Sequence, residues 1–103
     1  MPLKQKTITE LCGREGKRVF VITPKRNLEL NMDELPPLVS ENGFRIKVKA
    51  VLGMTFDNGS KENVSILKSG IMLIEGANNE KEAYELYSKL IIDGLKVSRS
   101  NIE

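Results

Sequence analysis

Residues 62–76 read Glu-Asn-Val-Ser-Ile-Leu-Lys-Ser-Gly-Ile-Met-Leu-Ile-Glu-Gly, and the rest of the predicted fold is organised around them. Two apolar runs flank Ser69-Gly70, a pair typical of tight turns, so the stretch predicts a β-hairpin. With a two-residue turn, Leu67 lies opposite Met72 and Ser65 opposite Ile74, and paired residues share a face. The hairpin is then apolar on both sides, as strands inside a layered structure are.

Each face of this hairpin needs its own cover. The predicted faces consist of Val64, Ile66, Ile71 and Leu73 on one side and of Leu67, Met72 and Ile74 on the other. The C-terminal helix predicted below can cover only one of them. An uncovered apolar face more often has a protein partner, a dimer mate or a parent domain than it stays bare. We therefore take Leu67, Met72 and Ile74 as candidate partner-binding residues; the alternative is that residues 1–30 fold across them.

The composition is that of an ordinary globular domain. The chain has 103 residues, of which 40% are apolar and 29% charged, which suits one domain with one modest core. No apolar run approaches the roughly 20 residues of a membrane-spanning helix, and residues 1–6 lack the apolar segment of a secretory signal. Cys12 is the single cysteine, so no disulfide can form within the chain. These features predict a soluble protein of the reducing cytoplasm.

The first half of the chain supplies a strand, a short helix and a second strand. Residues 1–17 are polar and punctuated by glycine, which is typical of a flexible lead-in or linker. Residues 18–23 form an apolar, β-branched first strand that ends at Pro24. Two further prolines restrict the helix that follows to about residues 37–42. Residues 44–52 alternate between apolar and other side chains, which predicts one half-buried strand before the hairpin.

The last predicted element is an amphipathic helix. Asn79, with Glu82 in the third position after it, forms a capping box at the helix start. Gly94 marks the helix end, and residues 98–103 suit a tail. The predicted fold is a single α+β domain over residues 18–97, of order β-α-β-β-β-α, in which an antiparallel sheet has its helices packed on one face. The predicted buried stripe of this helix consists of Ala83, Leu86, Tyr87, Leu90 and Ile91.

Few residues of the chain are suited to catalysis. It contains no histidine, which is the commonest general base and a frequent metal ligand. A structural zinc site needs about four Cys or His ligands, and Cys12 alone is present. The glycines form no phosphate-binding loop, and Glu80, Glu82 and Glu85 suit the solvated start of a helix. We predict no catalytic, cofactor-binding or metal-binding residue and no catalysis by this chain alone.

Residues 44–52 also carry the best candidate for a charged surface. Arg45, Lys47 and Lys49 recur at every second position and so fall on one side of the predicted strand. Three cations in a row could meet the phosphates of a nucleic acid or an acidic protein. The alternative is a solvated edge strand whose charges oppose aggregation.

The order of several short motifs resembles a known family. After Cys12-Gly13 come residues 19–25 (Val-Phe-Val-Ile-Thr-Pro-Lys), residues 27–30 (Asn-Leu-Glu-Leu), the strand that begins at Phe44, and the hairpin. This order is similar to the C-terminal domain of archaeal ThiF/MoeB/HesA-type adenylyltransferases, which are relatives of ubiquitin-activating enzymes. The family's Gly-rich nucleotide loop and CxxC pairs have no counterpart here, so the resemblance implies neither ATP nor zinc binding.

That resemblance implies a non-catalytic protein-interaction domain. It would belong to a system that adenylates the C-terminus of a ubiquitin-like or sulfur-carrier protein. Its partner would be a parent adenylation domain or such a carrier; a second copy of the chain is the partner that the uncovered apolar face adds. No membrane association is implied.

A second resemblance is shorter. Ser69-Gly70-Ile71-Met72, with Gly76-Ala77 leading into a helix over residues 80–92, is similar to one repeat of TATA-box-binding protein. This similarity implies a nucleic-acid-binding module that lays its bare sheet face on the DNA minor groove. Leu67 stands where that family is expected to carry an aromatic residue, and a second repeat is missing. Nucleic-acid binding is therefore the alternative function.

Overall fold

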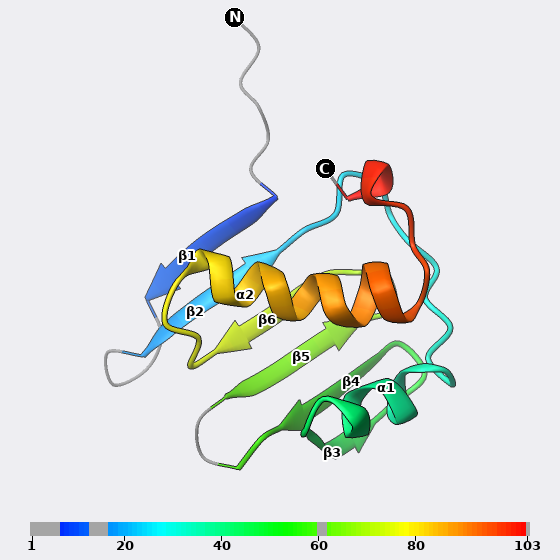
Figure 1. The fold of residues 1–103 in the computed structure, drawn as a ribbon, viewed down its shortest axis with the longest axis horizontal. Coiled ribbons are helices and arrows are strands. Elements are labelled where there is room, and N and C mark those ends of the chain that lie inside the picture. Colours follow the sequence, from blue (N-terminus) through cyan, green and yellow to red (C-terminus); the bar gives the residue numbers. More distant parts are fainter. Residues whose placement is uncertain (1–6, 13–16, 60–61, 103) are drawn as a thin grey trace, which may run out of the picture.

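The computed structural model describes residues 7–12, 17–59 and 62–102, which form an α+β fold (Figure 1). Its sheet has six antiparallel strands in the order β1-β2-β6-β5-β4-β3. The strands are β1 (Ile8–Cys12), β2 (Arg18–Ile22), β3 (Arg45–Lys49), β4 (Gly53–Asp57), β5 (Asn63–Leu67) and β6 (Met72–Glu75). The helices are α1 (Leu35–Glu41), α2 (Glu80–Tyr87), its π-helical continuation η2 (Ser88–Gly94) and a short 3-10 helix, η3 (Arg99–Asn101).

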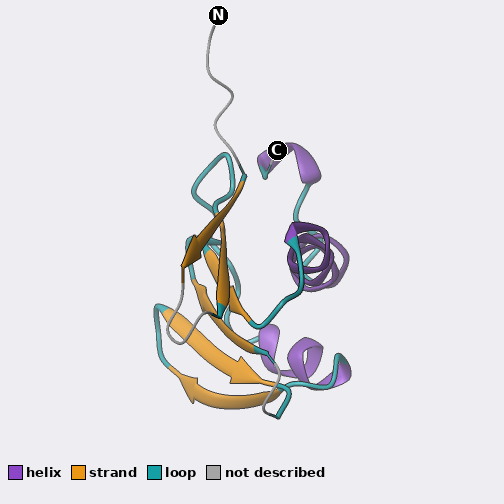
Figure 2. Ribbon diagram, turned by 90° about the vertical axis from the view of Figure 1, so that its left-hand side faces the viewer, coloured by secondary structure: helices purple, strands orange, loops and turns teal. Residues whose placement is uncertain are grey.

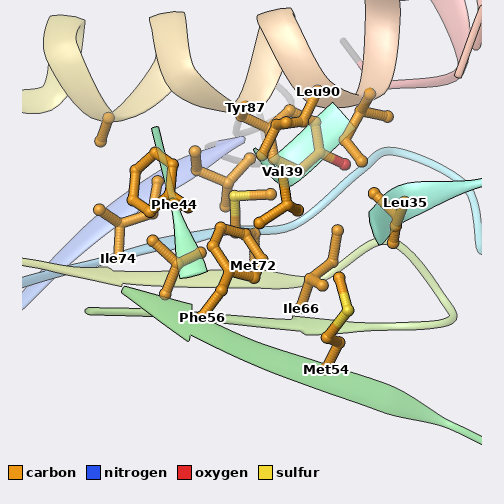
Figure 3. Packing of buried hydrophobic residues seen from close by; sticks show 14 of the residues in the cluster. Leu35, Val39, Phe44, Met54, Phe56, Ile66, Met72, Ile74, Tyr87 and Leu90 are labelled. Carbon is orange, nitrogen blue, oxygen red and sulfur yellow. The ribbon is translucent and has the colours of Figure 1, made fainter. Parts of the chain in front are cut away.

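The helices lie on one side of the sheet, which confirms the predicted α+β fold (Figure 2). Figure 3 shows Met72, Ile66 and Phe56 pointing from the strands toward Tyr87 and Leu90. All five of these side chains are 0% exposed, so the core fills the space between sheet and helices. In the part of the chain that the structure describes, no helix covers the opposite side of the sheet, which we call the open face.

The sheet contains two strands that the sequence pattern did not reveal. Residues 44–52 are not one strand, because the chain turns after β3 and the Ala50 N–H donates to the Gly53 carbonyl at 2.8 Å. Val51 and Leu52 lie at this turn, and their apolar side chains make the turn resemble a continued strand. The chain then returns as β4, which pairs with β3 and β5.

The other unexpected strand lies at the N-terminal edge. β1 pairs along its whole length with β2, and the Thr23 N–H donates to the Thr7 carbonyl at 2.7 Å. The prediction of a flexible lead-in over residues 1–17 is therefore wrong for the five residues of β1. The rest of that prediction concerns residues 1–6 and 13–16, which lie outside the described residues, and Lys17.

The central hairpin exists, but its register differs by one residue from the predicted one. Ile66 pairs with Met72 and Ser65 with Leu73. The Leu67 N–H donates to the Ile71 carbonyl at 2.8 Å, which leaves a turn of three residues that ends at Gly70, with φ 100°. A slip of one residue moves every side chain of a strand to the opposite face. Met72 and Ile74 consequently lie in the core, while Leu67 and Leu73 lie on the open face.

Helix α2 forms where the sequence predicts it. The Asn79 Oδ1 accepts a hydrogen bond from the Glu82 N–H at 2.9 Å, which confirms the predicted N-cap. The buried Tyr87 hydroxyl donates to the Gly70 carbonyl at 2.8 Å and so joins the helix to the hairpin turn. Beyond η2 the backbone reaches the left-handed conformation at Lys96, with φ 62°, two residues after the predicted end.

Residues 24–30, which we call the strap, run from β2 across the end of the sheet. The Leu28 N–H donates to the Ser69 carbonyl at 2.8 Å, so the strap is tied to the hairpin turn. The Lys25 N–H donates to the Ile102 carbonyl at 2.9 Å, and the Ile102 side chain is 0% exposed. The predicted tail over residues 98–103 is therefore wrong as far as Ile102, because this side chain belongs to the core; residue 103 lies outside the described residues.

Candidate functional site

Cross-strand pairing arranges the open face in rows that run across the sheet. The central row reads, from β1 to β3, Thr9, Val21, Leu73, Ser65, Thr55 and Val48. The polar row beside it reads Leu11, Val19, Glu75, Asn63, Asp57 and Arg45. Leu67 lies on the opposite side of the central row, toward the β3–β4 turn. The open face therefore grades from charged to apolar along the strand direction.

Large apolar side chains are exposed on this side of the molecule. Leu73 is 37% exposed and Leu67 is 43% exposed, and they lie on adjacent strands in diagonal positions, where long side chains touch. Val48 and Leu11, near the two edges, are 60% and 49% exposed. Scattered exposed apolar residues are normal, so the adjacent pair of Leu67 and Leu73 is the candidate for an interaction surface on this face. The remaining large exposed apolar residues of the described chain are Val51 and Leu52 at the β3–β4 turn.

The polar row carries charges of both signs. The buried Asp57 carboxylate lies 3.7 Å from Nη2 of Arg45 and 3.9 Å from Nζ of Lys47. The Gly59 N–H also donates to it at 3.2 Å, so the burial of this carboxylate is compensated. Further along the row, Glu75 lies 3.6 Å from Nζ of Lys17. The row is therefore a set of ion pairs 3.6 to 3.9 Å long rather than a uniformly basic surface.

The predicted basic stripe is divided by the structure. The β3–β4 register shifts between Ile46 and Val48, which is the signature of a β-bulge. Arg45 and Lys47 lie on the open face, but Lys49 pairs with the buried Met54, and its Nζ lies 3.2 Å from Oδ1 of Asp33. The prediction that Arg45, Lys47 and Lys49 share one face is wrong because a bulge breaks the strict alternation on which it rests.

The candidate partner-binding residues are divided in the same way. Leu67 is exposed on the open face, whereas Met72 and Ile74 lie under α2 and cannot reach a partner in this fold. Leu73, Val48 and Leu11 are the exposed apolar open-face residues that the sequence analysis did not propose. The signal that would find Leu73 is the turn Lys68-Ser69-Gly70, because a three-residue loop with glycine last shifts the register and exchanges the faces.

Perturbed ionisable groups in the described chain have structural explanations. Burial raises the pKa of Tyr87, whose hydroxyl is held in the core by Gly70. The hydrogen bond from Arg18 lowers the pKa of Glu10 on the exposed β1–β2 pair.

Among the described residues, no group of three or more His, Cys, Asp or Glu side chains is placed to hold a metal ion. No helix in the described ranges is long and apolar enough to cross a membrane.

A cleft of about 750 Å³ borders the apolar end of the open face. It lies between residues 29–33 and the β3–β4 turn. Val51, at this turn, is one of the exposed apolar residues and also lines the cleft. Its lining combines Lys49 and Lys68 with Glu29 and Asp33, so it has no dominant charge. The cleft makes the surface concave beside the β3–β4 turn. The residues that line it form no recognisable catalytic arrangement.

Comparisons with protein-family models, with curated proteins and with solved structures give no significant match for this chain.

Proposed function

We propose that this domain is a non-catalytic protein-interaction module that binds a partner protein through the open face of its sheet. The observation that carries the proposal is the position of the large exposed apolar side chains. They lie on the open face or at the β3–β4 turn beside it. Burying a leucine completely is worth about 1.5–3 kcal/mol, so covering the exposed parts of Leu67 and Leu73 contributes about 1 kcal/mol each.

The distribution of aromatic residues favours a protein partner over a nucleic acid. Single-stranded nucleic acids are bound largely by stacking bases on exposed aromatic side chains. The three phenylalanines and Tyr87 are buried in the core, and Tyr84 packs against that core from α2. The open-face cations Arg45 and Lys47 already lie beside the Asp57 carboxylate, which lowers their value for phosphates. We therefore rank the nucleic-acid module below the protein-interaction module.

The class of partner follows from the sequence resemblance to ThiF/MoeB/HesA-type adenylyltransferases. It comprises a parent adenylation domain and a ubiquitin-like or sulfur-carrier protein; the uncovered sheet face adds a second copy of this chain. We expect the interaction to take place in the cytoplasm, where an unpaired Cys12 stays reduced. The chain needs no cofactor for this role.

A capture experiment with matched variants tests the proposal. The tagged domain is incubated with lysate of its own organism, washed at high salt, and the retained proteins are identified by mass spectrometry. Leu73→Lys introduces a charge on the open face, and Ser40→Lys introduces the same side chain at an exposed position of α1, away from that face. Capture of an adenylating enzyme or a carrier by the wild type and by Ser40→Lys, but not by Leu73→Lys, supports the proposal. Equal capture by all three proteins, or retention of nucleic acid alone until salt removes it, contradicts it.

Circular dichroism must accompany this experiment. Leu73 is partly exposed, so Leu73→Lys is expected to keep the fold. Loss of capture is attributed to the open face when the midpoint of thermal unfolding of Leu73→Lys is close to that of Ser40→Lys.

A further inference from the structure

We infer that the open face binds a second copy of this chain, so that two sheets pack face to face around a two-fold axis. This inference rests on the proposed function and names its partner. Two packed sheets lie about 10 Å apart and interdigitate their inner side chains. The distribution of charge, the pairing of the rows and the area of the open face suit such a self-contact.

The distribution of charge selects the direction of the axis. A two-fold axis between the sheets and parallel to the strands lays each row on the same row of the second copy, in reverse order. The polar row then meets a polar row, and the central row meets a central row. An axis across the strands would instead lay Arg45 and Glu75 on the end of the face that carries Leu67. That arrangement buries the Glu75 carboxylate of the central strand β6 against the apolar end of the face, so the parallel axis is preferred.

Reversal about the middle of the sheet, between β6 and β5, lays β6 of each copy over β5 of the other and matches the rows at these two central strands. At the outer strands of the polar row, Leu11 lies over Arg45 and Val19 over Asp57. Leu73 comes to lie opposite Ser65 of the second copy, which sets a large side chain over a small one. Glu75 comes to lie opposite Asn63 of the second copy, whose Oδ1 is 3.5 Å from Nζ of Lys47. The Glu75 carboxylate of each copy thereby meets the Lys47 ammonium group of the other, and the contact occurs twice.

Both charged groups are accessible for this contact. The Glu75 side chain is 34% exposed and the Lys47 side chain is 51% exposed. Their ion pairs within the chain are long, at 3.6 Å to Lys17 and 3.9 Å to Asp57. A second copy can therefore add an opposite charge to each group without displacing an existing short contact.

The size of the face sets the expected strength of the dimer. Six strands about 4.8 Å apart and about five residues at roughly 3.3 Å each give a face of roughly 29 by 17 Å, or about 500 Å². Two copies then bury about 1,000 Å², which is the lower end for a specific interface. We expect a reversible dimer with a dissociation constant in the micromolar range.

Sedimentation equilibrium between about 5 and 500 µM measures this dimer directly. Wild type and Ser40→Lys are expected to dimerise. Leu73→Lys is expected to raise the dissociation constant by about a hundredfold or more, because two ammonium groups would be buried at the centre of the interface. Glu75→Lys alone and Lys47→Glu alone are each expected to raise it by about tenfold, because each places like charges opposite one another twice.

An equimolar mixture of Glu75→Lys and Lys47→Glu supplies the decisive control. In the mixed dimer, one contact keeps its original charges and the other has them exchanged, so both are again attractive. Wild-type affinity in the mixture supports the two-fold arrangement, and a mixture as weak as the single variants overturns it. Thermal unfolding of each variant checks that the charge changes leave the fold intact.

The two proposals fail in different ways. A wild type that stays monomeric at about 500 µM while capture from lysate still depends on Leu73 overturns the dimer and leaves the interaction module standing. A dimer that is insensitive to Leu73→Lys uses another surface and overturns the inference. If capture from lysate is also insensitive to Leu73→Lys, the interaction module is wrong as well.

Discussion

Replacing Gly70 by alanine tests how the strap is packed on the hairpin turn. The Gly70 φ angle of 100° is unfavourable for any residue with a Cβ atom. A Cβ atom here would lie 2.6 Å from Cδ1 and 3.0 Å from Cγ of Leu28, and 3.1 Å from Cγ of Pro24. The strap cannot withdraw freely, because the Leu28 N–H is bonded to the Ser69 carbonyl. The substitution therefore combines backbone strain with overpacking.

The cost can be divided with a matched control. Gly59 has nearly the same φ, 99°, but a Cβ atom there would meet no heavy atom of the described residues within 4 Å. Gly59→Ala should therefore cost only the backbone strain, about 1–2 kcal/mol. Gly70→Ala should add an overpacking cost of about 1–3 kcal/mol, for a total of about 2–5 kcal/mol. The difference between the two variants measures the contact between strap and turn.

Urea unfolding followed by circular dichroism is the suitable assay. With a slope of about 1–3 kcal/mol per molar urea, the midpoint of Gly70→Ala should lie about 1 M below that of Gly59→Ala. The slope itself should not change, since neither variant alters the surface that unfolding exposes. Equal midpoints for the two variants would refute the packing of Leu28 and Pro24 against the turn.

Three further substitutions test the helix cap, the C-terminal anchor and the buried tyrosine. Asn79→Ala should cost about 0.5–2 kcal/mol in urea unfolding because the Glu82 N–H loses its acceptor, and Asn78→Ala should cost less. Ile102→Ala should cost about 2–5 kcal/mol in the same assay, and a near-zero cost would mean that Ile102 is not part of the core. Burial raises the pKa of Tyr87 above its ordinary 10.0, so the unfolded chain loses this proton first and stability falls as the pH rises above 10. Tyr87→Phe should remove that decline in unfolding experiments from neutral to alkaline pH, and an unchanged decline would assign it to other groups.

Elements with local signals could be predicted from the sequence. Asn79 and Glu82 fix the start of α2 through a contact within one helical turn, and the apolar stripe fixes its buried side. The hairpin was equally clear, since its two apolar runs flank a glycine-containing turn. The register of the hairpin could not be predicted, because the sequence Lys68-Ser69-Gly70 is compatible with a turn of two residues and with one of three.

The missed strands and the misassigned site residues share a physical cause. Val51 and Leu52 continue an apolar pattern across a turn, and the bulge after Ile46 interrupts a pattern that looks continuous. β1 is stabilised by its pairing with β2 rather than by its own composition, and such pairing produces no pattern in the residues of β1 themselves. No described helix covers the open face, but which hairpin residues lie on it depended on the register. Leu73 therefore takes the place that Met72 was predicted to have.

The position of β2 between β1 and β6 has a consequence for the folding pathway. Strand β2 pairs with β6, and residue 19 lies opposite residue 75, so this pairing requires a long loop to close. Strands β3 to β6, in contrast, each pair with the strand next to them in the sequence. We expect the β3–β6 meander to form first and the β1–β2 hairpin to dock last. Until it docks, β6 is a bare edge strand with unpaired backbone groups. That intermediate stage is when the chain is most open to mispairing with its neighbours.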